Sequence, residues 1–453
     1  YTNRVVMSLM YQGLFAVDSR NNTTPILCSQ YQVTPDNRTW TIYLEPNATF
    51  SDGTRVTVQD VVASYEQARQ NVYYKGRFTH IARVELSSDG GVDFFLDTPY
   101  QNLALLLDIP IVKASEVTVD NPLGTGPYSL EDGIGGKHLQ RVVGWWCSSD
   151  DLVAKDSSIA LVEAESPSQI RDEFEFSGLS VVCTNPQTDS YADYRCDFEL
   201  WEVDSGFMMY IGCNVTYSKF FDDGTLRTFL TYGIDRQTLV DDNYGGLALP
   251  TTLPISPMSP YYSKSLATNY DYDEMRFIDA ASKFRVPTND KGVPRTLQLL
   301  VNSDDSARLR CARNIAATLT ELGLACETVE SPTSVYEARL QAANYDIYLG
   351  ITKLPTTADL SEFYRPWGEM SWGGLANETI YNMVNQSLAD RGNYYNLHKL
   401  VADDGRIIPV MAGYYAIYAK RGVLSDLNPA RDNVFYYTLG KTMESSKVAT
   451  QFS

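Results

Sequence analysis

The stretch LQLLVNSDDSARLRCARNIAATLTELGL, residues 297–324, decides the fold class. Its first five residues form an apolar run typical of a buried strand. Apolar residues then recur at the spacing of one helix face, and Asp304, Asp305 or Ser306 is expected to cap the start of that helix. Gly323 stands where the left-handed residue that follows a helix is expected. The pattern predicts a strand followed by an amphipathic helix.

The residues that follow continue this alternation. We interpret 324–329 and 345–350 as two further strands, with a polar helix over 334–343 between them. A βαβαβ order favours a parallel or mixed sheet covered by helices, and hence an α/β fold. Upstream, a predicted helix lies between two half-buried strands, and these segments are residues 40–44, 58–70 and 92–96.

Length and charge restrict the class of protein. The chain has 453 residues, enough for two or three lobes, and carries 56 acidic against 37 basic residues, a formal charge of −19. No Lys/Arg-rich stripe stands out, which argues against nucleic-acid binding. No run of 18 apolar residues predicts a membrane span. Because the sequence starts at Tyr1 without a signal peptide, we interpret it either as a mature fragment or as a trimmed piece of the chain.

Cysteine and histidine usage argues against a metal site and against catalysis. The seven Cys show no C-x-x-C spacing, and none of the three His lies near a Cys in sequence, so we expect no zinc and no other cofactor. Cys183 and Cys196 either close a loop as a disulfide or stay as thiols. No His stands in the context of a catalytic triad, and the acidic pairs fall in polar loops. We therefore expect no enzyme.

Four short motifs follow one another along the chain, and their order and spacing are informative. They are FSDGTRVTVQDVVAS at 50–64, LGTGPY at 123–128, FFDDGTLRTFLTYGIDR at 220–236, and Pro250 with LPISP at 253–257. In the first, Asp-Gly makes a tight turn and Thr57 caps a helix that has Asp60 at its third position. In this order the motifs resemble family 5 of the extracellular solute-binding proteins of ABC importers, the family of oligopeptide-, dipeptide- and nickel-binding proteins.

The resemblance implies a type II periplasmic-binding-protein fold, in which two lobes surround a ligand cleft. Lobe 1 would be discontinuous, lobe 2 continuous, and a small additional domain would be attached to lobe 1. The expected bounds are 1–24, 123–250 and 409–453 for lobe 1, 25–122 for the additional domain and 251–408 for lobe 2.

The resemblance also implies ligand contacts where the chain crosses between the lobes and at the ends of strands. Peptide binders carry an acidic residue in the loop that corresponds to Gly350–Asp359, where it pairs with the ammonium group of the peptide. Here Lys353 or Leu354 falls at that position, and a lysine there either favours an anionic group or is a plain surface charge. The predicted ligand contacts are Phe207, Met208, Tyr210, Thr333, Thr352, Lys353, Asp359, Trp372 and Tyr414.

The function that this resemblance implies is capture of a peptide or peptide-like ligand and its delivery to ABC permease subunits in the membrane. A monomer outside the cytoplasm is expected, either lipid-anchored at the cell surface or periplasmic. Two alternatives remain open. The same clamp would bind a non-peptide ligand, such as an oligosaccharide, an opine-like compound or a small anion, or it would serve as a sensor or scaffold without transport.

Overall fold

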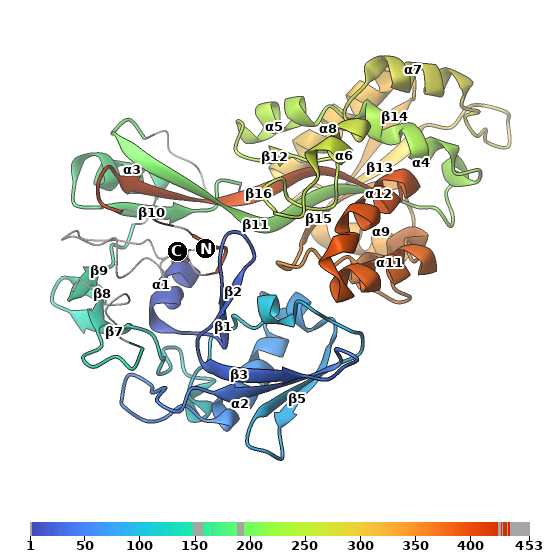
Figure 1. The fold of residues 1–453 in the computed structure, drawn as a ribbon. Coiled ribbons are helices and arrows are strands. Elements are labelled where there is room, and N and C mark those ends of the chain that lie inside the picture. Colours follow the sequence, from blue (N-terminus) through green and yellow to red (C-terminus); the bar gives the residue numbers. More distant parts are fainter. Residues whose placement is uncertain are drawn as a thin grey trace. The chain divides into compact units, whose positions relative to one another are not determined.

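The protein divides into two compact units in the computed structural model (Figure 1). The structure describes residues 2–147, 157–164, 166–187, 194–424, 427, 429–432 and 434. Unit 1 comprises residues 1–204 and 415–453, and unit 2 comprises residues 205–414. The three-part division expected from the sequence stays a prediction. It differs from the two units over 205–250 and 409–414, and residues 435–453 of its final segment lie outside the described residues.

Unit 1 contains a four-stranded antiparallel sheet in the order β3-β4-β6-β5, with helix α2 beside it, and a three-stranded sheet β7-β8-β9. The helix begins as expected, because Thr57 and Asp60 cap each other: the Thr57 amide donates to Asp60 Oδ2 at 2.8 Å. The elements of this unit are α1 Thr2–Met10, β1 Phe15–Val17, β2 Thr23–Pro25, β3 Cys28–Val33, β4 Thr39–Leu44, α2 Val58–Gln70, η1 Lys75–Phe78, β5 Ile81–Leu86, β6 Val92–Leu96, η2 Leu103–Leu106, η3 Ala114–Glu116, β7 Tyr128–Gly133, β8 Gly136–Arg141, β9 Ser158–Ala160, α3 Pro167–Phe176 and β10 Val181–Thr184.

Two long strands belong to both units. The unit boundaries fall between Asp204 and Ser205 in β11 (Phe198–Cys213) and between Tyr414 and Tyr415 in β16 (Ile407–Lys420). They form part of the largest sheet, whose path is β10-β16-β11-β15-β13-β14, with β12 paired to β16.

Unit 2 is an α/β layer structure. The predicted strand, helix and strand of 297–331 are present, and Asp305 is the residue that caps the helix. The elements are η4 Lys219–Phe221, α4 Thr225–Phe229, η5 Leu230–Gly233, α5 Arg236–Tyr244, β12 Leu249–Pro250, α6 Lys264–Ala267, η6 Thr268–Tyr270, α7 Glu274–Lys283, β13 Leu297–Asn302, α8 Ser306–Glu321, β14 Cys326–Ser331, α9 Thr333–Gln341, β15 Ile347–Lys353, α10 Ser361–Tyr364, η7 Trp372–Gly374, α11 Glu378–Ala389, η8 Arg391–Asn393 and α12 Tyr394–Asp404.

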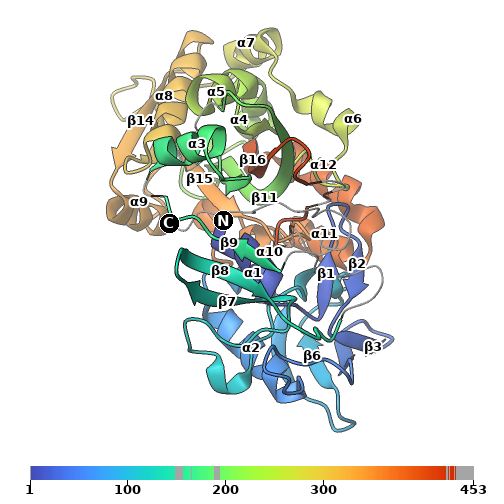
Figure 2. The same ribbon diagram turned by 90° about the vertical axis from the view of Figure 1, so that its left-hand side faces the viewer.

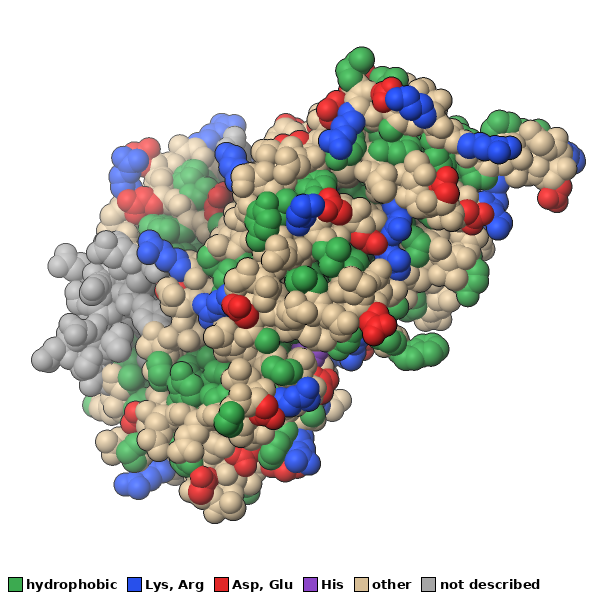
Figure 3. Space-filling model, turned by 45° about the vertical axis from the view of Figure 1, so that its right-hand side comes forward, with side chains coloured by type: hydrophobic (Ala, Val, Ile, Leu, Met, Phe, Trp, Pro, Cys, Tyr) green, Lys and Arg blue, Asp and Glu red, His purple; other side chains and the backbone are tan. Residues whose placement is uncertain are grey.

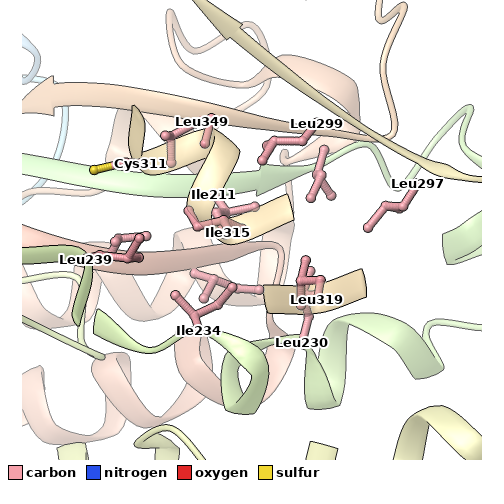
Figure 4. Packing of buried hydrophobic residues seen from close by; sticks show 14 of the residues in the cluster. Ile211, Leu230, Ile234, Leu239, Leu297, Leu299, Cys311, Ile315, Leu319 and Leu349 are labelled. Carbon is pink, nitrogen blue, oxygen red and sulfur yellow. The ribbon is translucent and has the colours of Figure 1, made fainter. Parts of the chain in front are cut away.

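Helices cover both faces of the unit 2 sheet: α5 and α8 lie on one face and α9 on the other (Figures 1 and 2). The apolar stripe of α8, including Ile315 and Leu319, packs with Ile211 of β11 and Leu299 of β13 in one buried cluster, shown in Figure 4. Residues 205–250 belong to unit 2 because β11, α4 and α5 supply much of this core.

The opposite face of the same strands carries buried tyrosines, each of which covers a glycine on the neighbouring strand. Tyr210 is paired with Gly350, and Tyr348 with Gly212. A Cβ atom on Gly350 would lie 2.6 Å from Cζ of Tyr210, and one on Gly212 would lie 2.2 Å from Cε1 of Tyr348. Glycine is therefore required at both positions, since the two rings fill the space that a side chain would take.

The structure can be compared with three further expectations. Cys183 and Cys196 are thiols and do not form a disulfide. Lys/Arg and Asp/Glu side chains are scattered among one another over the face seen in Figure 3, as the sequence indicated. Within the described residues, no helix has both the length and the apolar character needed to cross a membrane.

Candidate functional site

The carboxyl ends of three strands of unit 2 meet at one edge of the sheet, because β13 is parallel to both β14 and β15. Strand β11 is antiparallel to β15 and enters unit 2 at this same edge, where Phe207 pairs with Lys353. In open α/β sheets, ligands bind outside the carboxyl ends of the strands. The polar and aromatic residues at this place, which we call the carboxyl edge, are Phe207, Asn302, Asp304, Thr333, Thr352 and Lys353.

Thr333 connects the ends of β13 and β14. Its hydroxyl donates to Asp304 Oδ2 at 2.7 Å and its amide donates to the same oxygen at 2.8 Å, while Asn302 Nδ2 donates to the hydroxyl at 3.0 Å. The bonds from the amide and the hydroxyl hold the pKa of Asp304 below its ordinary value. The edge thus has an exposed, ordered and ionised carboxylate.

Lys353 ends β15 and is exposed, and Thr352 before it is half-buried. The next residue, Leu354, donates its amide hydrogen to the carbonyl of Gly206 at 2.8 Å, so the loop that follows leaves the sheet from a fixed point. Gly206 has a φ of +76°, a backbone conformation that L side chains rarely adopt. The predicted contacts Phe207, Thr352 and Lys353 are therefore brought together at one end of the β11–β15 pair.

Four other predicted contacts are buried. Tyr210 is 1% exposed, and its ring packs edge-on against Tyr348 and Phe363 at centroid distances of 5.7 and 5.0 Å. Met208 and Tyr414 are also buried, and so is Asp359, whose Oδ1 accepts the amide hydrogen of Ser361 at 2.8 Å. In these positions the four side chains support the sheet and the loop behind the carboxyl edge.

Trp372 lies at the opposite end of the sheet. The carbonyl of its neighbour Gly373 accepts the amide hydrogen of Thr216, which follows the C-terminal end of β11, at 3.2 Å. Since Phe207 lies near the other end of the unit 2 part of β11, the structure does not bring Trp372 together with the carboxyl edge. Its role as a ligand contact stays a prediction.

The sequence reasoning missed Arg308. This residue lies in the first turn of α8, directly after β13, and its side chain is 7% exposed. A signal was present, because a cation in the first turn of a helix runs against the helix dipole. An arginine at this position, after a buried strand, needs a nearby anion to offset its positive charge.

Unit 1 contains a buried charge cluster in which each charge has a partner. Arg77 forms ion pairs with Asp108 and with Asp432, the latter at 2.6 Å, and Arg4 donates to the Tyr415 hydroxyl at 2.6 Å. Arg4 and both aspartates also line a cavity of about 40 Å³. Because the cluster ties the segment around Asp432 to α1 and η1, we interpret it as structural.

A second and larger hollow, about 570 Å³, opens on unit 2 beside α7 and α12. Several of its polar groups contact one another: Tyr270 donates to Asp403 at 2.6 Å, Lys399 forms an ion pair with Asp403, and the Arg276 guanidinium lies 3.7 Å from the ring centroid of Tyr232. These groups satisfy one another without a ligand.

Comparison with known proteins agrees with this architecture. The chain matches the profile of the bacterial extracellular solute-binding proteins, family 5 Middle, over residues 22–374. Glutathione-binding protein GsiB of Escherichia coli O6:K15:H31 is 25% identical over 291 residues, 59% of this chain and 55% of that protein. The chain thus aligns with about half the length of this curated relative.

Two solved structures share the fold at low sequence identity. A putative peptide binding protein, AppA from Clostridium difficile, aligns with a TM-score of 0.76 at 16% identity, over 98% of this chain and 96% of that one. NikA from Brucella suis, in complex with Fe(III)-EDTA, aligns with a TM-score of 0.73 at 16% identity, over 98% and 95%.

The fold and the carboxyl edge define the class of a type II solute-binding protein. The chain belongs to the bacterial extracellular solute-binding proteins, family 5. This confirms both the resemblance and the fold that the sequence motifs implied.

Proposed function

We propose that this protein is the ligand-capturing component of an ABC importer, and that its ligand is a peptide or a peptide-like compound bound at the carboxyl edge. The observation that carries the proposal is the edge itself. Phe207 offers an apolar surface, Lys353 a cation and Asp304 an ordered carboxylate, all at the strand ends where such folds bind ligands. A peptide has complementary groups for all three.

Membership of the family supports the remaining parts of the proposal. The protein would act outside the cytoplasmic membrane, lipid-anchored or periplasmic, as a monomer that delivers its ligand to permease subunits. It would bind its ligand without chemical change, in keeping with relatives that are a glutathione-binding protein and a putative peptide binding protein.

A second candidate ligand is a non-peptide anion, which the lysine at the end of β15 favours. The carboxylate of Asp304 opposes this candidate, since it would repel an anion that has no cationic group of its own.

Thermal-shift measurements with tripeptide pools, oligosaccharides and small anions test the proposal. A ligand that binds only the folded protein raises Tm by an amount set by its concentration relative to Kd. We expect a rise with a peptide pool. A rise with an oligosaccharide or with phosphate, and none with any peptide pool, would refute it.

A further inference from the structure

The guanidinium of Arg308 is a buried charge whose bonding is incomplete. Its Nε lies 3.6 Å from Asp305 Oδ2, a distance for an ion pair but not for a hydrogen bond, and its Cζ lies 5.4 Å from the ring centroid of Tyr336. Within the part of the chain that the structure describes, Nε has no hydrogen-bond partner. A guanidinium carries five N–H donors, and buried charges are normally paired and hydrogen-bonded.

The position of Arg308 indicates which kind of group would complete the hydrogen bonding of its guanidinium. Helix α8 begins four residues after β13 ends, and α9 begins two residues after β14 ends, so the first turns of both helices lie at the carboxyl edge. Arg308 is in the first turn of α8, and Tyr336 is in the first turn of α9. The charge is therefore buried beneath the surface at which this family fold binds its ligand.

We propose that Arg308 binds the carboxylate of the ligand, so that the ligand class is one of compounds with a free carboxylate group, such as peptides with a free C-terminus. The planar fork of a guanidinium matches a carboxylate with two parallel hydrogen bonds. This inference rests on the proposed function, since it assigns the ligand to the carboxyl edge.

The neighbouring charges restrict the ligand further. Asp305 lies beside Arg308, and Asp304 is ionised and exposed at the same edge. Two carboxylates disfavour a multiply charged anion such as phosphate, whereas they attract an ammonium group on the same ligand. Both hydrogen bonds from Thr333 reach Oδ2 of Asp304, so Oδ1 accepts neither of them. A zwitterion that carries a carboxylate and an ammonium group fits this pattern.

The experiment compares one tripeptide pool with free C-termini and the same pool with amidated C-termini. Binding to the whole protein is measured by thermal shift and by calorimetry. For the wild type we expect the amidated pool to bind at least about tenfold more weakly. Arg308→Gln should weaken binding of the free-acid pool by a similar factor and remove the preference. Arg308→Lys, which keeps the charge and loses the fork, should give an intermediate loss.

Arg313→Gln is the matched control, because Arg313 lies on the same helix with an exposed ion pair to Glu330. It should bind both pools as the wild type does. Far-UV circular dichroism checks that each variant is folded. Arg308→Met adds a second readout: it removes an incompletely bonded buried charge, so the ligand-free variant should melt no lower than the wild type. A lower Tm with unchanged binding would assign Arg308 a purely structural role and overturn the inference.

The two proposals fail in different ways. If both pools bind equally to the wild type and to Arg308→Gln, the inference is wrong and the proposed function stands. If neither pool binds but the zwitterion alanine raises the Tm of the wild type and not of Arg308→Gln, the carboxylate site stands and the peptide ligand is wrong. If phosphate binds as well as alanine, the carboxylate class is wrong. If none of these probes binds, both proposals are wrong.

Discussion

Phe207 and Lys353 are direct cross-strand partners at the carboxyl edge, in the terminal pair of the β11–β15 register. An aromatic ring and a cation are thereby held side by side on two paired strands, whose hydrogen bonds fix the distance between them. In the proposed site, this pair would supply both an apolar surface and a charge to the ligand.

The charge of Lys353 is expected to set the preference for an anionic group. Lys353→Glu should lower the affinity for a free-acid peptide at least about tenfold, since a charged hydrogen bond contributes about 1.5–3 kcal/mol. Isothermal titration calorimetry measures the change. Lys291→Glu, at an exposed position between α7 and β13, alters the net charge equally and should leave affinity unchanged. Equal effects of both substitutions would show that Lys353 acts only through the long-range electrostatic field and not by contact with the ligand.

Thr333 is expected to keep Asp304 ionised at low pH. Thr333→Val removes the hydroxyl donor, so the pKa of Asp304 should rise toward its ordinary value of 3.8. The pH titration of the Asp304 carboxyl carbon, followed by NMR, measures this shift. Thr333→Ser retains the donor and should keep the pKa low. If the valine and serine variants titrate alike, the amide bond alone holds the carboxylate.

Gly350→Ala tests the contact between the glycine and the Tyr210 ring. The added Cβ would lie 2.6 Å from Cζ of a ring that is itself packed against Tyr348 and Phe363. Overpacking of this kind costs about 1–3 kcal/mol of the free energy of unfolding, which urea denaturation measures. Gly135→Ala, where no atom lies within 4 Å of the new Cβ, should stay within about 0.5 kcal/mol of the wild type. Equal unfolding midpoints for both variants would contradict the steric account.

His398 is expected to make the protein sensitive to acid. It is fully buried, and within the described residues neither ring nitrogen has a hydrogen-bond partner. Burial lowers its pKa from 6.5 to about 3, so between these values the unfolded chain binds a proton that the folded protein does not. The stabilisation is fully present above pH 6.5 and is lost as the pH falls toward 3.

The size of this effect follows from the shift. Between pH 6.5 and pH 4 the wild type should lose about 3 kcal/mol of unfolding free energy through His398, at about 1.4 kcal/mol for each pH unit. His398→Leu removes this contribution, so its stability should fall less over the same range. Urea unfolding at several pH values measures both profiles, and parallel profiles would show that His398 does not titrate on unfolding.

The fold could be predicted from the sequence where local patterns and tertiary packing agree. The stripe of α8 and the reciprocal caps of Thr57 and Asp60 are local signals, and the structure contains both. The sequence predicts Tyr210 as a ligand contact because it lies in a crossing strand. The sequence does not show that a glycine opposite it and Phe363 from α10 close over its ring, since both are contacts at long range.

The candidate site could be predicted in part for a similar reason. Lys353 and Thr333 follow strands, so their place at a carboxyl edge can be inferred from the βαβ order. Trp372 could not be placed from the sequence. Between Lys353 and Trp372 the chain returns to the other end of β11, and the number of residues between them does not reveal this path. Arg308 could have been found from its charge at the start of a helix.

Helix α8 packs into the core along most of its length, whereas its first turn lies at the carboxyl edge. This separation has a consequence for which substitutions the protein can accept. One face of the middle and end of α8, which carries Cys311, Ile315 and Leu319, is buried in the core, whereas Arg308 lies in the first turn and is not part of that cluster. Substitutions at the first turn and at positions such as Thr333 and Lys353 alter few core contacts. A lineage could therefore exchange one ligand for another by a few substitutions, and a designer who wanted a biosensor could vary the same positions on an intact scaffold.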